Sequence, residues 1–342
     1  MSLFLKTLKG ERDAKTPLWL MRQAGRYLPE YRALREGHSM LEMVMTPELA
    51  CEVTLQPLRR FALDAGIIFA DILTPLIGMG AQLDFRKGEG PVIDNPVRSR
   101  ADVERLRVPE PAENVGYTLE AIKLVVRELG GRTPLIGFCG APFTLASYLI
   151  EGHSPGDLEH TKGMMTKDPQ TWHLLQSKLA NLSADYLLAQ VDAGCQALQI
   201  FDSWLGFVGP REYDTFVEPY LISLVQQVRR RTDVPLIFFA TGVAGLFPRL
   251  AKLDVTAFGV DWRLSLAQAQ GLLGRSVPLQ GNLDPQILTG DWSYVASSVR
   301  AILEDAKGLS AGHVFNLGHG ILPHTPVENV ERLVGLVKDY SS

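Results

Sequence analysis

Short apolar runs recur along the whole 342-residue chain, each followed by turn residues and most by a helical pattern. The runs are continuous rather than alternating, which is typical of strands buried on both faces of a parallel sheet. Such strands, alternating with helices, predict an α/β protein, and eight of them predict a (β/α)8 TIM barrel; a doubly wound open sheet is the alternative. The runs are Leu18–Met21, Ile67–Leu73, Leu135–Cys139, Ala197–Phe201, Leu236–Ala240, Ala257–Val260, Val277–Gln280 and Val314–Leu317.

No internal repeat or linker-like tract divides the chain, so we expect a single barrel domain over residues 1–342. Helical patterns fill most intervals between the runs, and Pro219 lies inside one of them, where it predicts a kink or a split. The interval 82–98 places apolar residues among glycines and predicts an excursion or small hairpin over the barrel mouth. The expected helices are 49–61, 114–129, 170–192, 211–231, 264–273, 292–306 and 327–339.

The composition is that of a globular protein with an ample core, since 46% of the residues are hydrophobic and 21% are charged. A net charge of −4, a pI near 6.0 and the lack of a basic run argue against nucleic acid as the main partner. The N-terminus lacks the long apolar segment of a secretory signal. The uncharged stretch Thr133–Ile150 contains Pro134 and Gly137, which favours a strand and loop over a membrane span. We therefore expect a cytoplasmic protein with no membrane partner.

Motifs for metals and cofactors are absent from the sequence. The three cysteines are scattered and form no C-x-x-C pair, which fits a reducing cytoplasm and argues against a disulfide framework or a cysteine-rich zinc site. His313, His319 and His324 lack the i, i+4 spacing of a helical zinc site. No P-loop occurs, and the glycines at 78 and 80 fall short of a dinucleotide-binding pattern. We expect neither a metal nor a cofactor.

Two arginines lie four residues apart directly after the first apolar run, in the pentapeptide Arg22-Gln-Ala-Gly-Arg26. A guanidinium pairs bidentately with carboxylate or phosphate, so Arg22 and Arg26 form a candidate anion clamp. Gly25 between them lets backbone approach a ligand closely. The alternative is an ordinary solvated helix start, in which the arginines pair with Glu30 or Glu36.

Polar residues also follow the other runs, and the carboxyl ends of barrel strands are where active sites are built. Each such residue alone is better explained as a cap or turn residue, but together they would surround one mouth. Asp71 has apolar neighbours on both sides, so its carboxylate should be partly buried and need a cation or several donors. Tyr148 suits either the core or the wall of a site. The strand-end set is Arg22, Asp71, Gly140, Asp202 with Ser203, Thr241, Asp261, Asn282 and His319.

Two stretches closely resemble the most diagnostic segments of the uroporphyrinogen decarboxylase family of haem biosynthesis: Pro17-Leu-Trp-Leu-Met-Arg-Gln-Ala-Gly-Arg-Tyr-Leu-Pro and Gly137-Phe-Cys-Gly-Ala-Pro-Phe-Thr-Leu-Ala-Ser-Tyr-Leu. Shorter segments around Asp71, Ser203, Asn282 and His319 agree as well. The resemblance implies a homodimeric (β/α)8 barrel and a cofactor-independent lyase. It also implies the reaction, in which the four acetate side chains of uroporphyrinogen III lose CO2 to become methyl groups, giving coproporphyrinogen III.

The resemblance further implies roles for individual residues. Asp71 would hydrogen-bond the pyrrole N–H groups at the centre of the macrocycle and stabilise a cationic intermediate. Arg22 and Arg26 would hold substrate carboxylates, and Arg22 is also a proposed proton donor, so Asp71 and Arg22 are the expected catalytic residues. The expected substrate-binding residues are Arg22, Gln23, Ala24, Gly25, Arg26, Asp71, Tyr148, Ser203 and His319.

Two other functions are alternatives to the decarboxylase that the resemblance implies. A related barrel family uses zinc to transfer methyl groups to corrinoid carriers or thiols, but it needs late cysteine and histidine ligands, and no cysteine follows Cys195. A non-catalytic tetrapyrrole carrier would retain the pocket, yet it has no evident need for the central carboxylate of Asp71.

Overall fold

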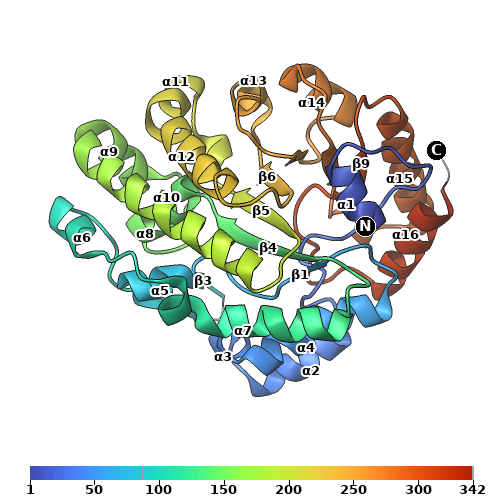
Figure 1. Ribbon diagram of the computed structural model, residues 1–342, viewed down its shortest axis with the longest axis horizontal. Coiled ribbons are helices and arrows are strands. Elements are labelled where there is room, and N and C mark those ends of the chain that lie inside the picture. The colour runs from blue at the N-terminus through green and yellow to red at the C-terminus, as the bar shows by residue number, and fades with distance from the viewer. Residues whose placement is uncertain (87, 341–342) are drawn as a thin grey trace.

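Seven parallel strands form one sheet in the computed structural model, which describes residues 1–86 and 88–340. The strands follow one another around the sheet in chain order, and the helices lie outside them (Figure 1). The six apolar runs predicted from Leu135 onward each overlap a strand. The strands are β1 (Gly66–Ile67), β4 (Leu135–Gly140), β5 (Ala197–Asp202), β6 (Leu236–Ala240), β7 (Ala257–Gly259), β8 (Leu279–Leu283) and β9 (His313–Leu317).

The eighth position is filled by the first apolar run, which is not the regular strand that the sequence predicts. Leu18 forms an isolated parallel bridge with Phe315 of β9, and the Phe315 N–H donates to Pro17 O at 2.8 Å. On the other side, the Asp64 N–H donates to Leu18 O at 2.8 Å, just before β1 begins. The run therefore lies between the last strand and the segment leading into the first, and it closes the ring without a full ladder.

The predicted strand over Ile67–Leu73 is also wrong in its length, because only Gly66–Ile67 is a strand. The N–H of Ile68 still donates to Ile136 O at 3.1 Å. The next N–H, that of Phe69, donates instead to the Thr54 hydroxyl at 2.9 Å. A side chain of helix α4 (Pro47–Arg60) thus accepts the bond that a strand partner would have accepted, and the chain turns away from the sheet before Asp71.

Helices surround the sheet: each predicted helical range is occupied, with boundaries shifted by a few residues, and further short helices lie outside those ranges. The longest, α10, packs against β4 and its neighbouring helices α7, α8 and α12. The helices are α1 (Leu3–Leu8), α2 (Pro29–Gly37), α3 (Met40–Met45), α4 (Pro47–Arg60), α5 (Pro75–Met79), α6 (Arg100–Arg105), α7 (Pro111–Leu129), α8 (Pro142–Glu151), α9 (Glu159–Lys167), α10 (Pro169–Asp192), α11 (Pro210–Glu212), α12 (Glu218–Arg229), α13 (Phe247–Leu250), α14 (Leu266–Leu273), α15 (Trp292–Lys307) and α16 (Val327–Asp339).

The break predicted at Pro219 is confirmed. The segment from Pro210 to Arg229 divides into α11, one π-helical turn over Tyr213–Val217, and α12. Pro219 lies in the first turn of α12, where the missing N–H has no intrahelical partner to lose.

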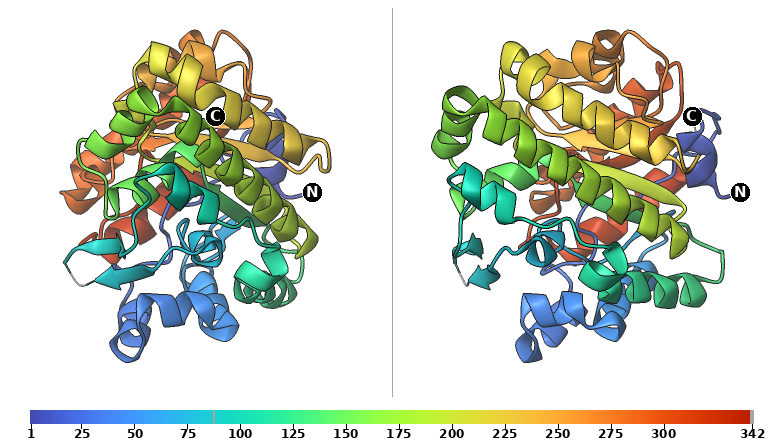
Figure 2. Two further views of the ribbon diagram at one scale, coloured as in Figure 1. Left: turned by 90° about the vertical axis from the view of Figure 1, so that its left-hand side faces the viewer. Right: turned by 60° about the vertical axis from the view of Figure 1, so that its left-hand side comes forward.

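The hairpin predicted within residues 82–98 is also present. Strands β2 (Leu83–Arg86) and β3 (Gly90–Ile93) pair antiparallel, apart from the main sheet (Figure 2). Val92 bridges His153, which joins the hairpin to the segment that follows α8.

A buried chain of polar side chains crosses the inside of the barrel. The Trp19 indole N–H donates to Gln280 Oε1 at 2.8 Å, and Gln280 Nε2 donates to Gln199 Oε1 at 3.0 Å. All three side chains are buried, so these bonds are made in a medium of low dielectric, where leaving a polar group unpaired is costly. The chain ties the irregular first run to β8 and β5.

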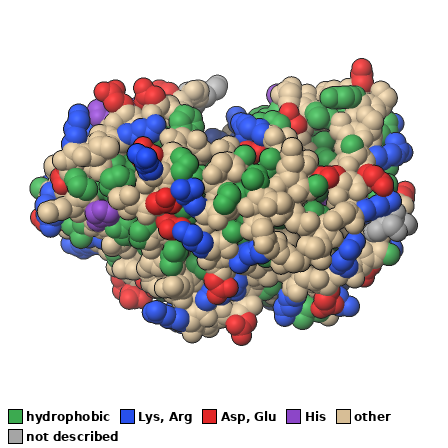
Figure 3. Space-filling model, turned by 90° about the horizontal axis from the view of Figure 1, so that it is seen from above, with side chains coloured by type: hydrophobic (Ala, Val, Ile, Leu, Met, Phe, Trp, Pro, Cys, Tyr) green, Lys and Arg blue, Asp and Glu red, His purple; other side chains and the backbone are tan. Residues whose placement is uncertain are grey.

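The outer surface carries charges of both signs, interspersed on the face shown in Figure 3. Among residues 1–86 and 88–340, no helix is long and apolar enough to cross a membrane.

His313 provides a pH-dependent test of the packing at the start of β9. Its Nε2–H donates to Gly281 O at 2.8 Å, and burial lowers the pKa of the imidazole from 6.5 to about 4. Between these values the unfolded chain binds more protons than the folded one, so acidification through this window weakens folding. We predict that the free energy of unfolding of the wild type, minus that of His313→Gln, falls as the pH is lowered from 6.5 to 4, measured by urea denaturation. A pH-independent difference would contradict a neutral buried imidazole.

Candidate active site

Arg22 follows the segment that closes the barrel, and its backbone is held in an unusual conformation. Its φ is +62°, in the left-handed region that residues with side chains rarely adopt. The Met21 N–H donates to Asn316 Oδ1 at 2.8 Å and the Ile321 N–H donates to Met21 O at 2.9 Å, so β9 and its loop fix the preceding residue. Backbone strain imposed by surrounding bonds is typical of functional sites, where it holds a side chain in place.

Gly320 forms the surface against which the Arg22 side chain lies. A Cβ on Gly320 would approach Arg22 Cδ to 2.3 Å and Nε to 2.8 Å. The absence of a side chain at 320 therefore sets the path of the guanidinium, and it links the first motif of the chain to the last one.

Asp71 lies half-buried after β1, as expected from its apolar neighbours. Its Oδ1 accepts the Leu73 N–H at 2.8 Å, and the Thr74 hydroxyl donates to its backbone oxygen at 2.9 Å. Burial raises the pKa of the Asp71 carboxyl, while the Leu73 N–H and the positive charge of Arg22 oppose that rise. Within the described residues Arg22 and Asp71 form no direct ion pair, so Oδ2 of Asp71 and the guanidinium remain available to a ligand.

Tyr148 and His319 belong to the same cluster. The charges of Asp71 and Arg22 both act on the Tyr148 hydroxyl, whose pKa is raised chiefly by burial. The Tyr148 ring packs edge-on against Trp204, with centroids 6.0 Å apart. Burial lowers the pKa of His319 to about 4, helped by the positive charges of Arg22 and Arg263, so the imidazole is neutral at pH 7.

The remaining clamp residues have different surroundings. Arg26 is exposed, and its charge acts on the hydroxyl of Tyr31. Gln23 is fully buried: its Oε1 accepts the Leu20 N–H and its Nε2 donates to Ala65 O. Its side chain therefore supports the turn beneath Arg22 and does not face the mouth. Ala24 and Gly25 are half-buried in that turn.

The alternative role of the two arginines, ion pairing with Glu30 or Glu36, is not found among the described residues. Glu30 accepts from Arg60 Nε at 3.0 Å, and among the described residues neither Arg22 nor Arg26 forms an ion pair with Glu30 or Glu36. Neither arginine is thus neutralised by the carboxylates of helix α2, which begins at Pro29.

Ser203 lies half-buried directly after β5, beside Trp204. Its backbone oxygen accepts the Thr241 hydroxyl at 3.0 Å, which ties the ends of β5 and β6 together. The preceding residue, Asp202, is buried and accepts the Thr144 hydroxyl at 2.6 Å, so it serves the junction with α8.

Two residues near the cluster escaped the sequence analysis. Tyr117 of α7 lies close enough for the Asp71 charge to act on its hydroxyl, but in a helical pattern it is indistinguishable from a core aromatic. Arg263 lies near His319 and comes three residues after the apolar run 257–260. Reading the strand ends two residues further would have found Arg263.

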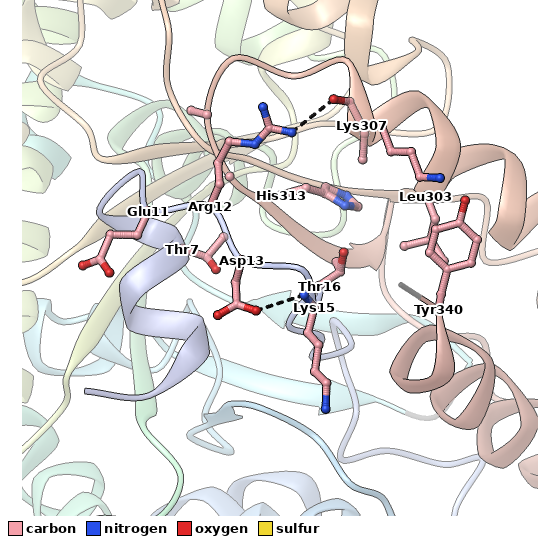
Figure 4. Close-up of a pocket in the computed structure, with 13 residues that line it drawn as sticks. Thr7, Glu11, Arg12, Asp13, Lys15, Thr16, Leu303, Lys307, His313 and Tyr340 are labelled. Carbon is pink, nitrogen blue, oxygen red and sulfur yellow. Dashed lines mark hydrogen bonds between the residues drawn. The ribbon is translucent and has the colours of Figure 1, made fainter. Parts of the chain in front are cut away.

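A separate hollow lies at the opposite end of the barrel (Figure 4). It is lined by residues that precede Leu18 and β9, among them Lys15, Thr16 and Gly312, and by Lys307 and Tyr340. None of the predicted site residues lines it. In the described ranges, no three His, Cys, Asp or Glu side chains gather as a possible metal site.

The carboxyl ends of the strands thus bring together Arg22, Asp71 and His319, and helix α8 adds Tyr148, so that four distant parts of the chain meet. Residues gathered from several strand ends at one mouth define a barrel enzyme. The comparison with protein families specifies which one. The chain belongs to the uroporphyrinogen decarboxylase (URO-D) family, whose model matches residues 1–340.

Relatives named uroporphyrinogen decarboxylase match this chain over nearly their full length. The uroporphyrinogen decarboxylase of Roseiflexus sp. (strain RS-1) is 50% identical, covering 100% of this chain and 99% of the relative. That of Chloroflexus aurantiacus is 52% identical, covering 98% and 95% respectively. The chain is therefore a decarboxylase of tetrapyrrole biosynthesis, as its motifs predict.

The solved structures support the fold. A methyltransferase from Methanosarcina mazei superposes with a TM-score of 0.83, covers 98% of this chain and 97% of its own, and is 22% identical. A B12-independent methionine synthase from Shewanella sp. W3-18-1 gives a TM-score of 0.57 at 13% identity, covering 96% and 95%. At these identities the likeness concerns the barrel architecture alone.

The contact between Gly320 and Arg22 gives a test of the site. In Gly320→Ala the new methyl group would displace the flexible Arg22 side chain rather than backbone, so we expect kcat/KM for uroporphyrinogen to fall about ten-fold or more with little change in Tm. Gly335→Ala in α16 is the control, because a Cβ there meets nothing within 4 Å. Equal kcat/KM in both variants would show that the position of Arg22 does not matter.

Proposed function

We propose that this chain removes the carboxyl groups of the four acetate side chains of uroporphyrinogen III, using Asp71 and Arg22 as its central residues. The single observation that carries the assignment of these residues is the half-buried Asp71 carboxylate, held at one oxygen and close to an unpaired Arg22. The carboxylate is thereby oriented, and its second oxygen is left for a ligand that donates N–H groups or carries positive charge.

The reaction needs a sink for the electron pair released when CO2 leaves. A pyrrole protonated at a ring carbon supplies that sink within the substrate, so the electrons flow into a cationic ring system. A proton then reaches the exocyclic carbon and the ring proton is lost, so each –CH2–COO⁻ group becomes –CH3 with uptake of one proton. The protein's contribution is to stabilise the cation and to orient the carboxylate that leaves.

Asp71 is suited to stabilise such a cation. A fixed negative charge in a partly buried site interacts more strongly with developing positive charge than the same charge does in water. The burial that raises the pKa of Asp71 also makes a cationic or N–H-bearing ligand its natural partner. The bond from Leu73 means that little reorientation is needed when the charge develops.

The cations and hydroxyls around Asp71 would bind the carboxylate arms of the substrate. Arg22 would hold one arm or act as the proton donor, and Arg26, which is also exposed, would hold another. Tyr148, Ser203 and the neutral His319 would donate hydrogen bonds to further arms. Gln23, Ala24 and Gly25 would act through the turn that carries both arginines, with Gln23 bonded beneath it.

The proposal includes a single-domain protein over residues 1–342 that acts as a cytoplasmic homodimer without a cofactor. Support for a reducing compartment comes from the cysteines, which are all free and buried. The substrate can act as its own electron sink, and this supports chemistry without a cofactor.

The assay that tests the function is anaerobic incubation with uroporphyrinogen, with product carboxyl number followed by chromatography after oxidation. We expect stepwise loss from eight carboxyls to four, and a fall in kcat of about 100-fold or more in Asp71→Asn, which removes the charge but keeps the shape. The control is Asp185→Asn, because Asp185 is another half-buried carboxyl with a raised pKa, on α10. Tight binding without carboxyl loss would instead identify a carrier, and a near-normal kcat in Asp71→Asn would exclude the cation-stabilising role.

The oligomeric state is tested separately by sedimentation velocity at micromolar protein. We expect a species of twice the 37.7 kDa chain mass. A monomer that persists as the concentration rises would contradict the dimer while leaving the catalytic proposal intact.

A further inference from the structure

Arg263 is a third arginine at the mouth, and its guanidinium is anchored on two sides. Nη1 donates to Asp261 Oδ2 at 2.7 Å, and the guanidinium carbon lies 4.0 Å from the centre of the Trp262 ring. Stacking on an aromatic face and pairing with a carboxylate together restrict a long side chain that would otherwise move freely in water.

The anchor itself is rigid. Asp261 is only 7% exposed, and its two oxygens also accept the N–H groups of Gly242 and Arg263. Asn282 donates to the Asp261 backbone oxygen at 3.0 Å. Asp261, which pairs with the Arg263 guanidinium, is thus bonded to residues at the ends of β6 and β8 as well as to its own loop.

Arg263 belongs to the same cluster as Arg22 and His319. The positive charges of both arginines act on the His319 imidazole. Trp262, on which Arg263 stacks, meets the His319 ring edge-on with centroids 6.4 Å apart. His319 is therefore near two guanidinium groups that are 241 positions apart in the sequence.

One edge of the guanidinium is unused. Arg263 is about half-exposed, and among the described residues Asp261 is the partner of Nη1 while Nε and Nη2 have no hydrogen-bond partner. The Nε–Nη2 edge presents two parallel N–H groups, which is the geometry that binds a carboxylate bidentately.

We propose that Arg263 binds a carboxylate arm of the substrate through its Nε–Nη2 edge. This inference rests on the proposed function, because the substrate is taken to be the eight-carboxylate tetrapyrrole. A substrate with so many negative charges needs several cations around its rim, and Arg263 supplies a third beside Arg22 and Arg26. Asp261 and Trp262 are the positioning residues that aim the guanidinium.

The test compares Arg263→Gln with Arg332→Gln. Arg332 is a matched control, since it stacks on Trp292 at 4.3 Å and pairs with Glu328 at 3.5 Å, on the outer helices α15 and α16. We expect Arg263→Gln to raise KM for uroporphyrinogen about ten-fold or more, with kcat changed much less, and to weaken the salt dependence of kcat/KM. Arg332→Gln should match the wild type.

Further measurements separate binding from a purely structural effect. Arg263→Lys keeps the charge but loses the paired donors, so its KM should also rise while its Tm stays near that of the wild type. In Arg263→Gln the pKa of His319, followed by NMR, should increase because one nearby positive charge is gone. If the wild type decarboxylates uroporphyrinogen and the KM of Arg263→Gln equals that of Arg332→Gln, the inference about Arg263 is wrong. If the wild type is inactive, it is the proposed function that fails.

Discussion

The pairing of the first apolar run with β9 is the constraint on which both the barrel and its site depend. The bonds around Leu18 and Phe315 close the sheet between its last and first strands. Met21, three residues after Leu18, is then held by Asn316 and the loop after β9, and Arg22 follows directly. Because β9 takes part both in closing the ring and in holding the residue before Arg22, closure of the barrel also positions the start of the Arg22 turn, where φ is +62°.

The mouth of the barrel holds the opposite charges of Asp71 and Arg22, which do not form an ion pair with each other among the described residues. The two groups influence each other all the same. A direct pair would satisfy both groups and leave little for a ligand, whereas separated charges keep their interactions for an incoming substrate. His319 stays neutral beside two guanidinium groups, so it adds hydrogen-bonding capacity without adding to their repulsion.

Much of this organisation could be predicted from local sequence. Continuous apolar runs with helical intervals follow from burial on both faces of a parallel sheet, and the break at Pro219 follows from its missing N–H. The two strand predictions that were wrong have a common cause. At Phe69 and at Met21 a side chain from elsewhere, Thr54 or Asn316, takes the N–H that a ladder would have used. Such long-range substitutions leave no local pattern.

The sequence by itself determined the class of fold, the family and the positions of the candidate residues at strand ends, because periodicity and motifs are properties of the chain. Only the tertiary structure decided which way those residues face. In the folded chain the Gln23 side chain lies in the core, Arg26 is exposed, and the Arg22 side chain packs against Gly320, about 300 residues away. The fold also brings Arg263 beside His319 through Trp262. The direction of each side chain depends on contacts across the closed barrel, which exist only once distant strands have paired.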